Sequence, residues 1–397
     1  MAFSFGLRSA FTIFGFQSKI GCTSGKKVKK CFLLCFSLGL HYLCSQINSY
    51  DMKKEKKSGK ALKTIAIILG ILILAALGIG YYFTRTPLLN EEETQYLYID
   101  RNDNIDSVMA KVSAIAKPHA MKGFKALADF RGYGDNIIRG RYGVDTKMSA
   151  NGLFNMLKRG EQTPLNVPIP SVRTMDKLAA AVGKKLELDS TELYRALTDE
   201  KVCQRYGYTL QTIPSMFIPD SYNMYWTVTV DEFLDRMKKE HDRYWNEERL
   251  AKAKALDMTP VEVSTLASIV TEETAATKEK PTVAGLYINR LRKGMLLQSD
   301  PTVKFAMHDF TIRRILNRML TTDDPYNTYK YKGLPPGPIR IPLKEDLEAV
   351  LNHEHHDYLY MCAKEDFSGT HNYARNEAEH AANARRYHQA LNARGIR

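Results

Sequence analysis

Cysteine is scarce in this sequence of 397 residues, and most of it lies at one end. Four of the six cysteines fall within residues 1–51, and only Cys203 and Cys362 follow. These two lack the short spacing of a zinc site, and the sequence leaves open whether they form a disulfide bridge. The histidine-rich run 353–356 does not give His-Glu-x-x-His, because Asp357 stands at the second histidine position. We therefore expect no metal site and no cofactor.

Net positive charge is also small outside the N-terminal region. Residues 1–63 hold twelve Lys or Arg and two acids, which is a net +10 of the total +13. The rest of the chain therefore carries only +3. A nucleic-acid groove needs a concentrated basic surface, so we expect no nucleic-acid partner.

Long hydrophobic runs are few, and one is long enough to cross a membrane. Residues 65–83 contain no charge, close to the roughly 20 apolar residues that a spanning helix needs. We predict a transmembrane helix over 64–84 behind a basic segment, 1–63. The basic flank predicts a cytoplasmic N-terminus and an inner (plasma) membrane protein whose bulk is periplasmic or extracytoplasmic. A buried core helix or a cleaved signal peptide would fit less well, since the run exceeds an ordinary signal h-region.

Residues 1–51 do not resemble the rest of the chain. They hold a second apolar patch, 31–44, and then Met52 opens the run Met-Lys-Lys-Glu-Lys-Lys. This run is typical of the start of an anchored protein. We therefore hypothesise that Met52 is the true initiator; a functional second hydrophobic segment is the alternative.

Residues 94–164 predict a small α/β module. Strands are expected at 95–99 and 139–144, and helices at 104–116 and 149–158. The size resembles a LysM-type carbohydrate-binding module, although the order strand–helix–helix–strand is not reproduced cleanly. An unspecific packing domain is the alternative. Residues 165–397 predict a larger mixed α/β domain with helices at 172–182, 190–197 and 229–250, so the fold class is α+β.

A further helix is predicted to begin at Thr259. The Thr259 side chain can cap the helix, Pro260 suits its first turn, and Glu262 completes a capping box. This start fixes which later residues share one side of the helix.

The same helix carries a carboxylate on its apolar side. Steps of three and four residues place Glu273 with Leu266 and Ile269, whereas Glu272 lies about 100° away and is expected to be solvated. Burial raises the pKa of a carboxyl group, which then suits a general acid. The alternative is a core-edge glutamate paired with Arg290 or Arg292.

Two later segments offer polar and aromatic groups. Gln298 and Asp300 lie close together beside Ser299 and Thr302, a set that suits a hydroxyl-rich ligand. Residues 326–329 add Tyr326, Asn327 and Tyr329, and the prolines of 333–339, Pro336 among them, stiffen the following chain. We interpret this loop as a sugar platform; a purely structural turn is the alternative.

Taken together, these segments resemble the YceG-like family of endolytic murein transglycosylases. The matching runs are Ala267–Val270 with Glu273-Thr274, then 289–291, 297–303, 326–329 and 333–339, followed by parts of a closing segment. Their order and spacing agree over roughly 165–397, and the anchor and small module agree as well.

Two departures from the family pattern stand out. The family usually reads Ile-Val-Glu-Lys-Glu-Thr near the acid, whereas Thr271 and Glu272 replace its Glu-Lys here. Glu273 keeps the place of the family's catalytic acid. The closing Gly-Gly-His-Thr-Phe is altered around His371, so a role for His371 is not carried over.

The resemblance implies cleavage of the β-1,4 bond between N-acetylmuramic acid and N-acetylglucosamine. Glu273 would be the single catalytic acid and base, and the product would carry a 1,6-anhydro end. Substrate-binding roles are expected for six residues: Gln298, Asp300, Tyr326, Asn327, Tyr329 and Pro336. The partners implied are peptidoglycan glycan strands, the membrane and cell-wall synthesis proteins, with termination of nascent strands as the cellular role.

Two alternatives stay open. A hydrolytic muramidase would use Asp300 to activate water, as paired-carboxylate glycosidases do. A non-catalytic peptidoglycan-binding scaffold would bind glycan without cutting it.

Overall fold

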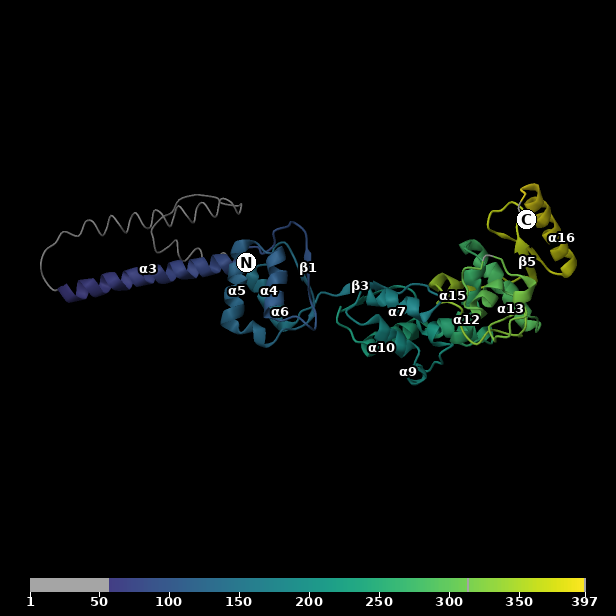
Figure 1. The fold of residues 1–397 in the computed structure, drawn as a ribbon, viewed down its shortest axis with the longest axis horizontal. Helices are drawn as coiled ribbons and strands as arrows, with labels where there is room; N and C mark the ends of the chain where they lie inside the picture. The colour runs from purple at the N-terminus through teal and green to yellow at the C-terminus, as the bar shows by residue number, and fades with distance from the viewer. Residues whose placement is uncertain (1–56, 313, 396–397) are drawn as a thin grey trace. The chain divides into compact units, whose positions relative to one another are not determined.

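The computed structural model describes residues 57–312 and 314–395 (Figure 1). The predictions for residues 1–51 and for Met52 as the initiator fall outside the described residues. The chain divides into two units at Ile79, and the unit from Ile79 onward contains three hydrophobic cores.

The predicted spanning segment lies within one continuous helix, α3 (Lys57–Arg85). Its stretch Lys63–Arg85 has a mean hydropathy of 2.5, and none of its most apolar part is buried. By length and composition this helix can cross a membrane, as the sequence predicts.

The first of the three cores, in chain order, belongs to the small module. Its elements are β1 (Gln95–Ile99), α4 (Ile105–Ile115), α5 (Pro118–Arg131), η1 (Tyr133–Asp135), β2 (Gly140–Val144) and α6 (Ala150–Arg159). Strands β1 and β2 pair antiparallel, with Leu97 opposite Tyr142. Both residues are buried in the core that the helices complete.

Helix α5 was missed by the sequence analysis. Its buried face includes the small residues Ala120, Gly123 and Ala128, so the periodicity of large apolar residues is weak. Helix α5 approaches the backbone of Phe83 closely, and this requires a small residue. A Cβ on Gly123 would lie 2.2 Å from the carbonyl oxygen of Phe83. With α5 included, the module runs strand–helix–helix–strand and then a third helix.

The second core surrounds a short hairpin. Its elements are β3 (Leu165–Pro168), α7 (Met175–Gly183), α8 (Ser190–Leu197), α9 (Glu200–Arg205), η2 (Ile213–Met216), β4 (Ser221–Met224) and α10 (Val230–Tyr244). Strands β3 and β4 pair antiparallel with Asn166 opposite Asn223. Val167 and Tyr222 point into the core, so the two asparagines lie on the exposed face of the hairpin.

The predicted helix 229–250 is wrong as a single helix. It breaks at Trp245 (φ −80°, ψ 62°), and α11 (Glu247–Ala255) begins afresh. The reason is local capping, because the Asn246 side chain accepts a hydrogen bond from the Arg249 N–H.

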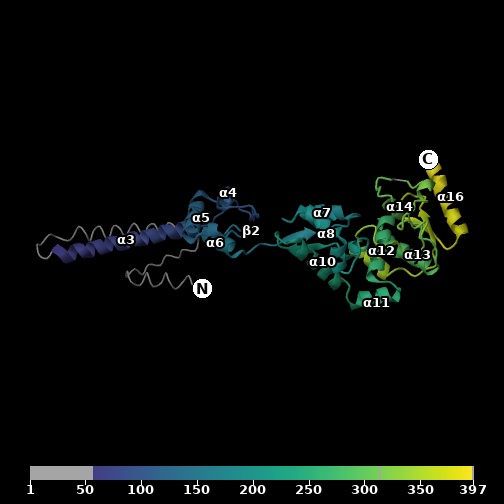
Figure 2. The same ribbon diagram turned by 60° about the horizontal axis from the view of Figure 1, so that its bottom comes forward.

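The third core contains the predicted acid. Its elements are α11, α12 (Pro260–Glu273), η3 (Thr277–Glu279), α13 (Lys280–Arg292), α14 (Asp300–Ala306), η4 (Asn317–Met319), α15 (Lys344–Leu351), β5 (Tyr360–Ala363), β6 (His371–Ala374) and α16 (Glu377–Ala393). Helix α12 packs against α13, α14 and α15. Figure 2 shows α13 and α14 beside it. Strands β5 and β6 form another antiparallel pair. The architecture is therefore mixed α+β, as predicted.

The two cysteines of this part of the chain are free thiols. Cys203 is buried in the second core, and Cys362 is half-buried on β5. The disulfide bridge that the sequence left open is therefore not formed.

Gly337 allows the proline-rich loop to lie directly on the backbone of Gln211. A Cβ there would lie 2.0 Å from the carbonyl oxygen of Gln211. We expect Gly337→Ala to lower the free energy of unfolding by about 1–3 kcal/mol, because backbone must shift. Thermal unfolding followed by circular dichroism measures the effect. Gly134→Ala, whose Cβ would meet Ile105 at an ordinary 3.5 Å, is the control, and equal losses in both variants would contradict the prediction.

Candidate functional site

Helix α12 sets the position of Glu273, its last residue. The predicted capping box is confirmed: the Thr259 Oγ1 accepts from the Glu262 N–H at 3.3 Å, and the Glu262 carboxylate accepts from the Thr259 N–H at 2.7 Å. All eight residues from Val263 to Val270 are buried. The two turns of the helix before its last turn are therefore enclosed on every side, more completely than one apolar face predicts.

The Glu273 carboxyl is held by two hydroxyl groups. Its Oε1 accepts a hydrogen bond from the Tyr287 Oη at 2.8 Å and another from the Ser299 Oγ. Tyr287 comes from α13 and is 2% exposed, and Ser299 is fully buried at the N-cap of α14. The alternative pairing with an arginine is not realised, since Arg290 donates to the carbonyls of Leu296, Leu297 and Leu359 instead.

Burial raises the pKa of Glu273 above its ordinary value. The charge of Asp300 acts in the same direction. Hydrogen bonds from Ser299 and Tyr287 lower the pKa, and so does the charge of His371, but desolvation is the largest effect. This environment favours the protonated acid that the sequence analysis expects.

Asp300 lies at the start of α14 and is exposed. Its Oδ1 accepts a hydrogen bond from the Tyr329 Oη at 2.6 Å, which joins α14 to the 326–329 loop. Tyr329 is half-buried, and burial together with this carboxylate raises its pKa. The hydroxyl of Tyr329 therefore stays protonated and acts as a donor.

Gln298 lies on the other side of Ser299 in a left-handed conformation, with φ 50°. Its N–H donates to the Thr328 carbonyl at 3.1 Å, and its exposed side chain accepts from Arg290 at 3.2 Å. The buried Thr328 hydroxyl accepts from the Ser299 N–H at 3.0 Å. The segments 298–300 and 326–329 are thus brought together, as the sequence analysis expects of one site.

Asn327 has a different place from the one expected. It is fully buried, and its Nδ2 donates to the carbonyls of Leu320 (2.9 Å) and Thr322 (2.8 Å). Its Oδ1 accepts from the Tyr329 N–H at 3.0 Å. In this conformation the amide shapes the loop and does not face a ligand, because all of these bonds are internal.

The other two expected platform residues differ in exposure. Tyr326 is half-buried and packs on Phe305 of α14, with ring centroids 4.6 Å apart. Pro336 is exposed at the tip of the proline-rich loop. The end of this loop is tied to α12, since the Ile339 N–H donates to the Ser268 Oγ at 3.0 Å.

Glu272 is not solvated, and that expectation is wrong. Its side chain is 12% exposed and is held between Arg173 and Arg340, with N–O distances of 2.7 and 2.8 Å. The partners lie 99 and 68 residues away in sequence, so helical phase alone does not reveal them. A small pocket of about 60 Å³ lies beside this ion pair, lined in part by Pro301 and Phe305.

The altered closing segment reaches the turn after α12. His371 pairs through Nδ1 with the Glu279 carboxylate at 3.1 Å, and its own N–H donates to the same carboxylate at 2.8 Å. The Thr274 hydroxyl donates to Glu279 as well, at 3.3 Å. His371 therefore lies near enough to influence Glu273 through charge.

Tyr287 and Ser299 are the site residues that the sequence analysis did not select. Tyr287 offered a signal, because a buried tyrosine on a predicted amphipathic helix needs a partner for its hydroxyl. As for metals, no cluster of three or more His, Cys, Asp or Glu side chains suited to an ion occurs among residues 57–312 and 314–395.

Comparison with known proteins gives one consistent result. The chain is 25% identical over 354 residues to an endolytic murein transglycosylase of Streptococcus pneumoniae (strain D39), covering 80% of this chain and 64% of that protein. It thus spans just under two thirds of that relative's length. An endolytic murein transglycosylase of Bacillus subtilis (strain 168) is 25% identical over 283 residues, which is 65% of this chain and 76% of that protein.

A solved YceG-like protein from Listeria monocytogenes superposes with a TM-score of 0.49 at 23% identity, over 74% of this chain and 99% of that one. The sequence model of the YceG-like family matches residues 97–386. Because this match covers well over half of the 397 residues, the chain belongs to the YceG-like family.

Proposed function

We propose that this protein is a lytic transglycosylase that cuts peptidoglycan strands internally, with Glu273 as its catalytic acid and base. The observation that carries the proposal is the carboxyl of Glu273, desolvated at the end of a buried helix and held by two hydroxyl donors. Family membership and the two relatives named as endolytic murein transglycosylases support it.

The proposed reaction needs one carboxyl group in two protonation states. Protonated Glu273 donates its proton to the glycosidic oxygen as the bond from C1 of N-acetylmuramic acid to that oxygen breaks. The resulting carboxylate then accepts the proton of the C6 hydroxyl, whose oxygen bonds to C1. The products are a free 4-hydroxyl on N-acetylglucosamine and a 1,6-anhydro end. Tyr287 and Ser299 stabilise the carboxylate between the two steps.

The two segments beside the acid are proposed to hold the sugar rings. Gln298, Asp300 and Tyr329 lie on segments joined to the Ser299 that contacts Glu273. Tyr326 and Pro336 extend this platform along the loop. We revise Asn327 from a sugar ligand to a residue that positions Tyr329, because its amide is used within the loop.

A hydrolytic muramidase is the second candidate, because Asp300 is exposed and close enough for its charge to raise the pKa of Glu273. In that reaction Asp300 would activate water. The hydrogen bond from Tyr329 to the Asp300 carboxylate favours the positioning role. Mass spectrometry of the products separates the two reactions, since an anhydro end is lighter by one water.

The proposed setting is the inner (plasma) membrane, with the N-terminus in the cytoplasm and the chain after Arg85 on the other side. The apolar helix Lys63–Arg85 and the basic residues before it support this orientation. An anchored enzyme that cuts strands internally could terminate nascent glycan. The strand–helix–helix–strand order of residues 95–144 supports a LysM-like module that binds glycan.

Glu273→Gln is expected to lower strand cleavage by at least about 100-fold, because the amide cannot donate or accept the proton. The measurement is the rate of appearance of anhydro-ended fragments from purified glycan strands. Glu248→Gln, the same substitution on the exposed side of α11, is the control and should retain full activity. Preserved cleavage by Glu273→Gln would refute the assignment of the acid.

The pH profile should respond in opposite directions to two substitutions. Activity needs protonated Glu273, so it is lost as pH rises through the pKa of that group. Asp300→Asn removes a charge that raises this pKa, and the alkaline limb should move to lower pH. Ser299→Ala removes a hydrogen bond that lowers it, and the limb should move to higher pH.

The measurement is kcat/KM against pH for the full chain in detergent. Asp300→Asn should still form anhydro ends, whereas a water-activating Asp300 would leave little activity at any pH. Limbs that move in the same direction in both variants would contradict the proposed electrostatics.

A further inference from the structure

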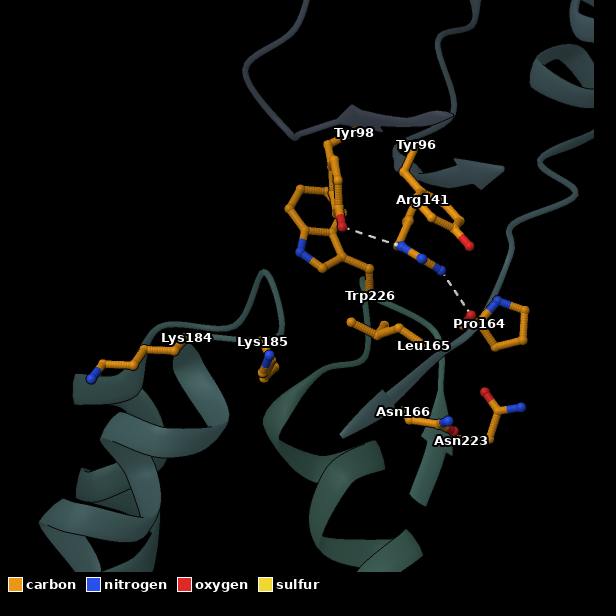
Figure 3. A pocket seen from close by; sticks show the side chains of 10 residues that line it. All are labelled: Tyr96, Tyr98, Arg141, Pro164, Leu165, Asn166, Lys184, Lys185, Asn223 and Trp226. Atoms are coloured by element: carbon orange, nitrogen blue, oxygen red, sulfur yellow. Dashed lines mark hydrogen bonds between the residues drawn. The ribbon is translucent and has the colours of Figure 1, made fainter. Parts of the chain in front are cut away.

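A second pocket lies away from Glu273, between the small module and the hairpin β3–β4. Its volume is about 630 Å³, within the range of ordinary ligand pockets. Figure 3 shows its wall of aromatic rings above and its paired asparagines below. None of its lining residues belongs to the site around Glu273.

Three aromatic side chains form one wall of this pocket. Tyr96 and Tyr98 point outward from β1, 46% and 41% exposed, while their neighbours Leu97 and Ile99 are buried. The Trp226 ring meets the Tyr98 ring edge-on at 5.2 Å. Such flat surfaces with polar rims suit the apolar faces of sugar rings.

The charge of the pocket has one sign. Arg141, Lys184 and Lys185 line it, and no acid does. Arg141 is only 8% exposed; it donates to the Tyr98 hydroxyl and to the carbonyls of Thr163 and Pro164. The Arg141 guanidinium also lies 3.6 Å over the Tyr96 ring. Within residues 57–312 and 314–395 no carboxylate forms an ion pair with any of the three, so the positive charges of this pocket are not neutralised by an acid of the described chain.

The floor of the pocket offers amides. Asn166 and Asn223 are cross-strand partners on the exposed face of the hairpin, and both line the pocket. The side-chain amides of these two residues can donate hydrogen bonds to, and accept them from, the acetamido and hydroxyl groups of amino sugars.

An ion pair and several hydrogen bonds connect the module side of the pocket to the hairpin side. The Glu187 carboxylate pairs with Arg139 at 3.2 Å and accepts from the Arg101 N–H at 3.0 Å. Gln162 and Thr227 exchange hydrogen bonds of 2.9 and 3.2 Å. These contacts join the two walls of the pocket.

We propose that this pocket is a second glycan-binding site, which takes an amino-sugar segment bearing carboxylates, as in a peptidoglycan strand with its peptide stems. Rings stack on Tyr98 and Trp226 beside the Arg141–Tyr96 pair, and carboxylates meet Arg141, Lys184 and Lys185. The inference rests on the proposed function, because it names where the same polymer is held away from the cut. A strand bound at both places is cut internally.

The test measures binding to the full chain in detergent, with Glu273→Gln present to prevent cleavage. Three probes are compared: glycan strands with peptide stems, neutral chitooligosaccharides, and a phosphate-bearing wall polymer without amino-sugar stems. Fluorescence of Trp226 reports binding, since Trp245, the other of the two tryptophans, is 4% exposed. Trp226→Phe should abolish the signal.

Lys184→Ala/Lys185→Ala should raise the Kd for stem-bearing strands by about tenfold and leave chitooligosaccharide binding unchanged. The matched control is Lys177→Ala/Lys201→Ala, which removes the same charge from exposed positions of α7 and α9. Equal Kd values in both double variants would overturn the proposal. The proposal would also be overturned if the chain with intact lysines bound the neutral probe or the phosphate polymer as tightly as it binds stem-bearing strands.

Failure of the proposed function would look different. If the wild-type chain releases no anhydro ends but the double variant still loses strand binding, the second site stands and the catalytic proposal falls. If the wild-type chain cleaves strands and the double variant binds them as tightly as the control, the catalytic proposal stands and the second site falls.

Discussion

The position of the Glu273 carboxyl depends on the burial of the eight residues of α12 that precede its last turn. Close packing around Val263–Val270 opposes rotation or sliding of the helix and so positions the last turn. Polar side chains near that turn then reach separate segments. The contacts are Ser268 with Ile339, Thr271 with Asp346, Glu272 with Arg340 and Glu273 with Tyr287. The loop and the helices that surround the acid are therefore placed by one buried element.

Adjacent glutamates on this helix have opposite electrostatic surroundings. Glu272 lies between two guanidinium groups, whereas Glu273 meets two neutral hydroxyls in a desolvated position. A cation beside Glu273 would stabilise its anion so strongly that it would hold no proton to give. Hydroxyl donors stabilise the anion less than a cation would, so the carboxyl group can still be protonated. The environment thus permits both protonation states, which a single acid and base must adopt in turn.

The parts of this site that follow from local chemistry were predictable from sequence, and the parts that depend on distant contacts were not. The capping box lies within four residues, and the polar segments 298–300 and 326–329 are unusual in themselves. The partners of Glu272 come from Arg173 and Arg340, far along the chain, so a residue expected in solvent is buried in an ion pair. Asn327 was predicted as a sugar ligand from its residue type alone, and its hydrogen bonds to nearby carbonyls depend on a loop conformation that the sequence does not reveal. Helix α5 was missed because small residues carry its packing.

Asp300 shows how a neighbouring carboxylate can assist a single-acid mechanism. In a hydrolase this group would use a lone pair to activate water, yet here one oxygen accepts the Tyr329 hydroxyl. Its charge raises the pKa of Glu273, which makes Glu273 a weaker acid but a stronger base. The second proton transfer, from the C6 hydroxyl, is the one that gains. Under the proposed mechanism, Asp300 therefore assists ring closure without contacting the sugar's reacting atoms.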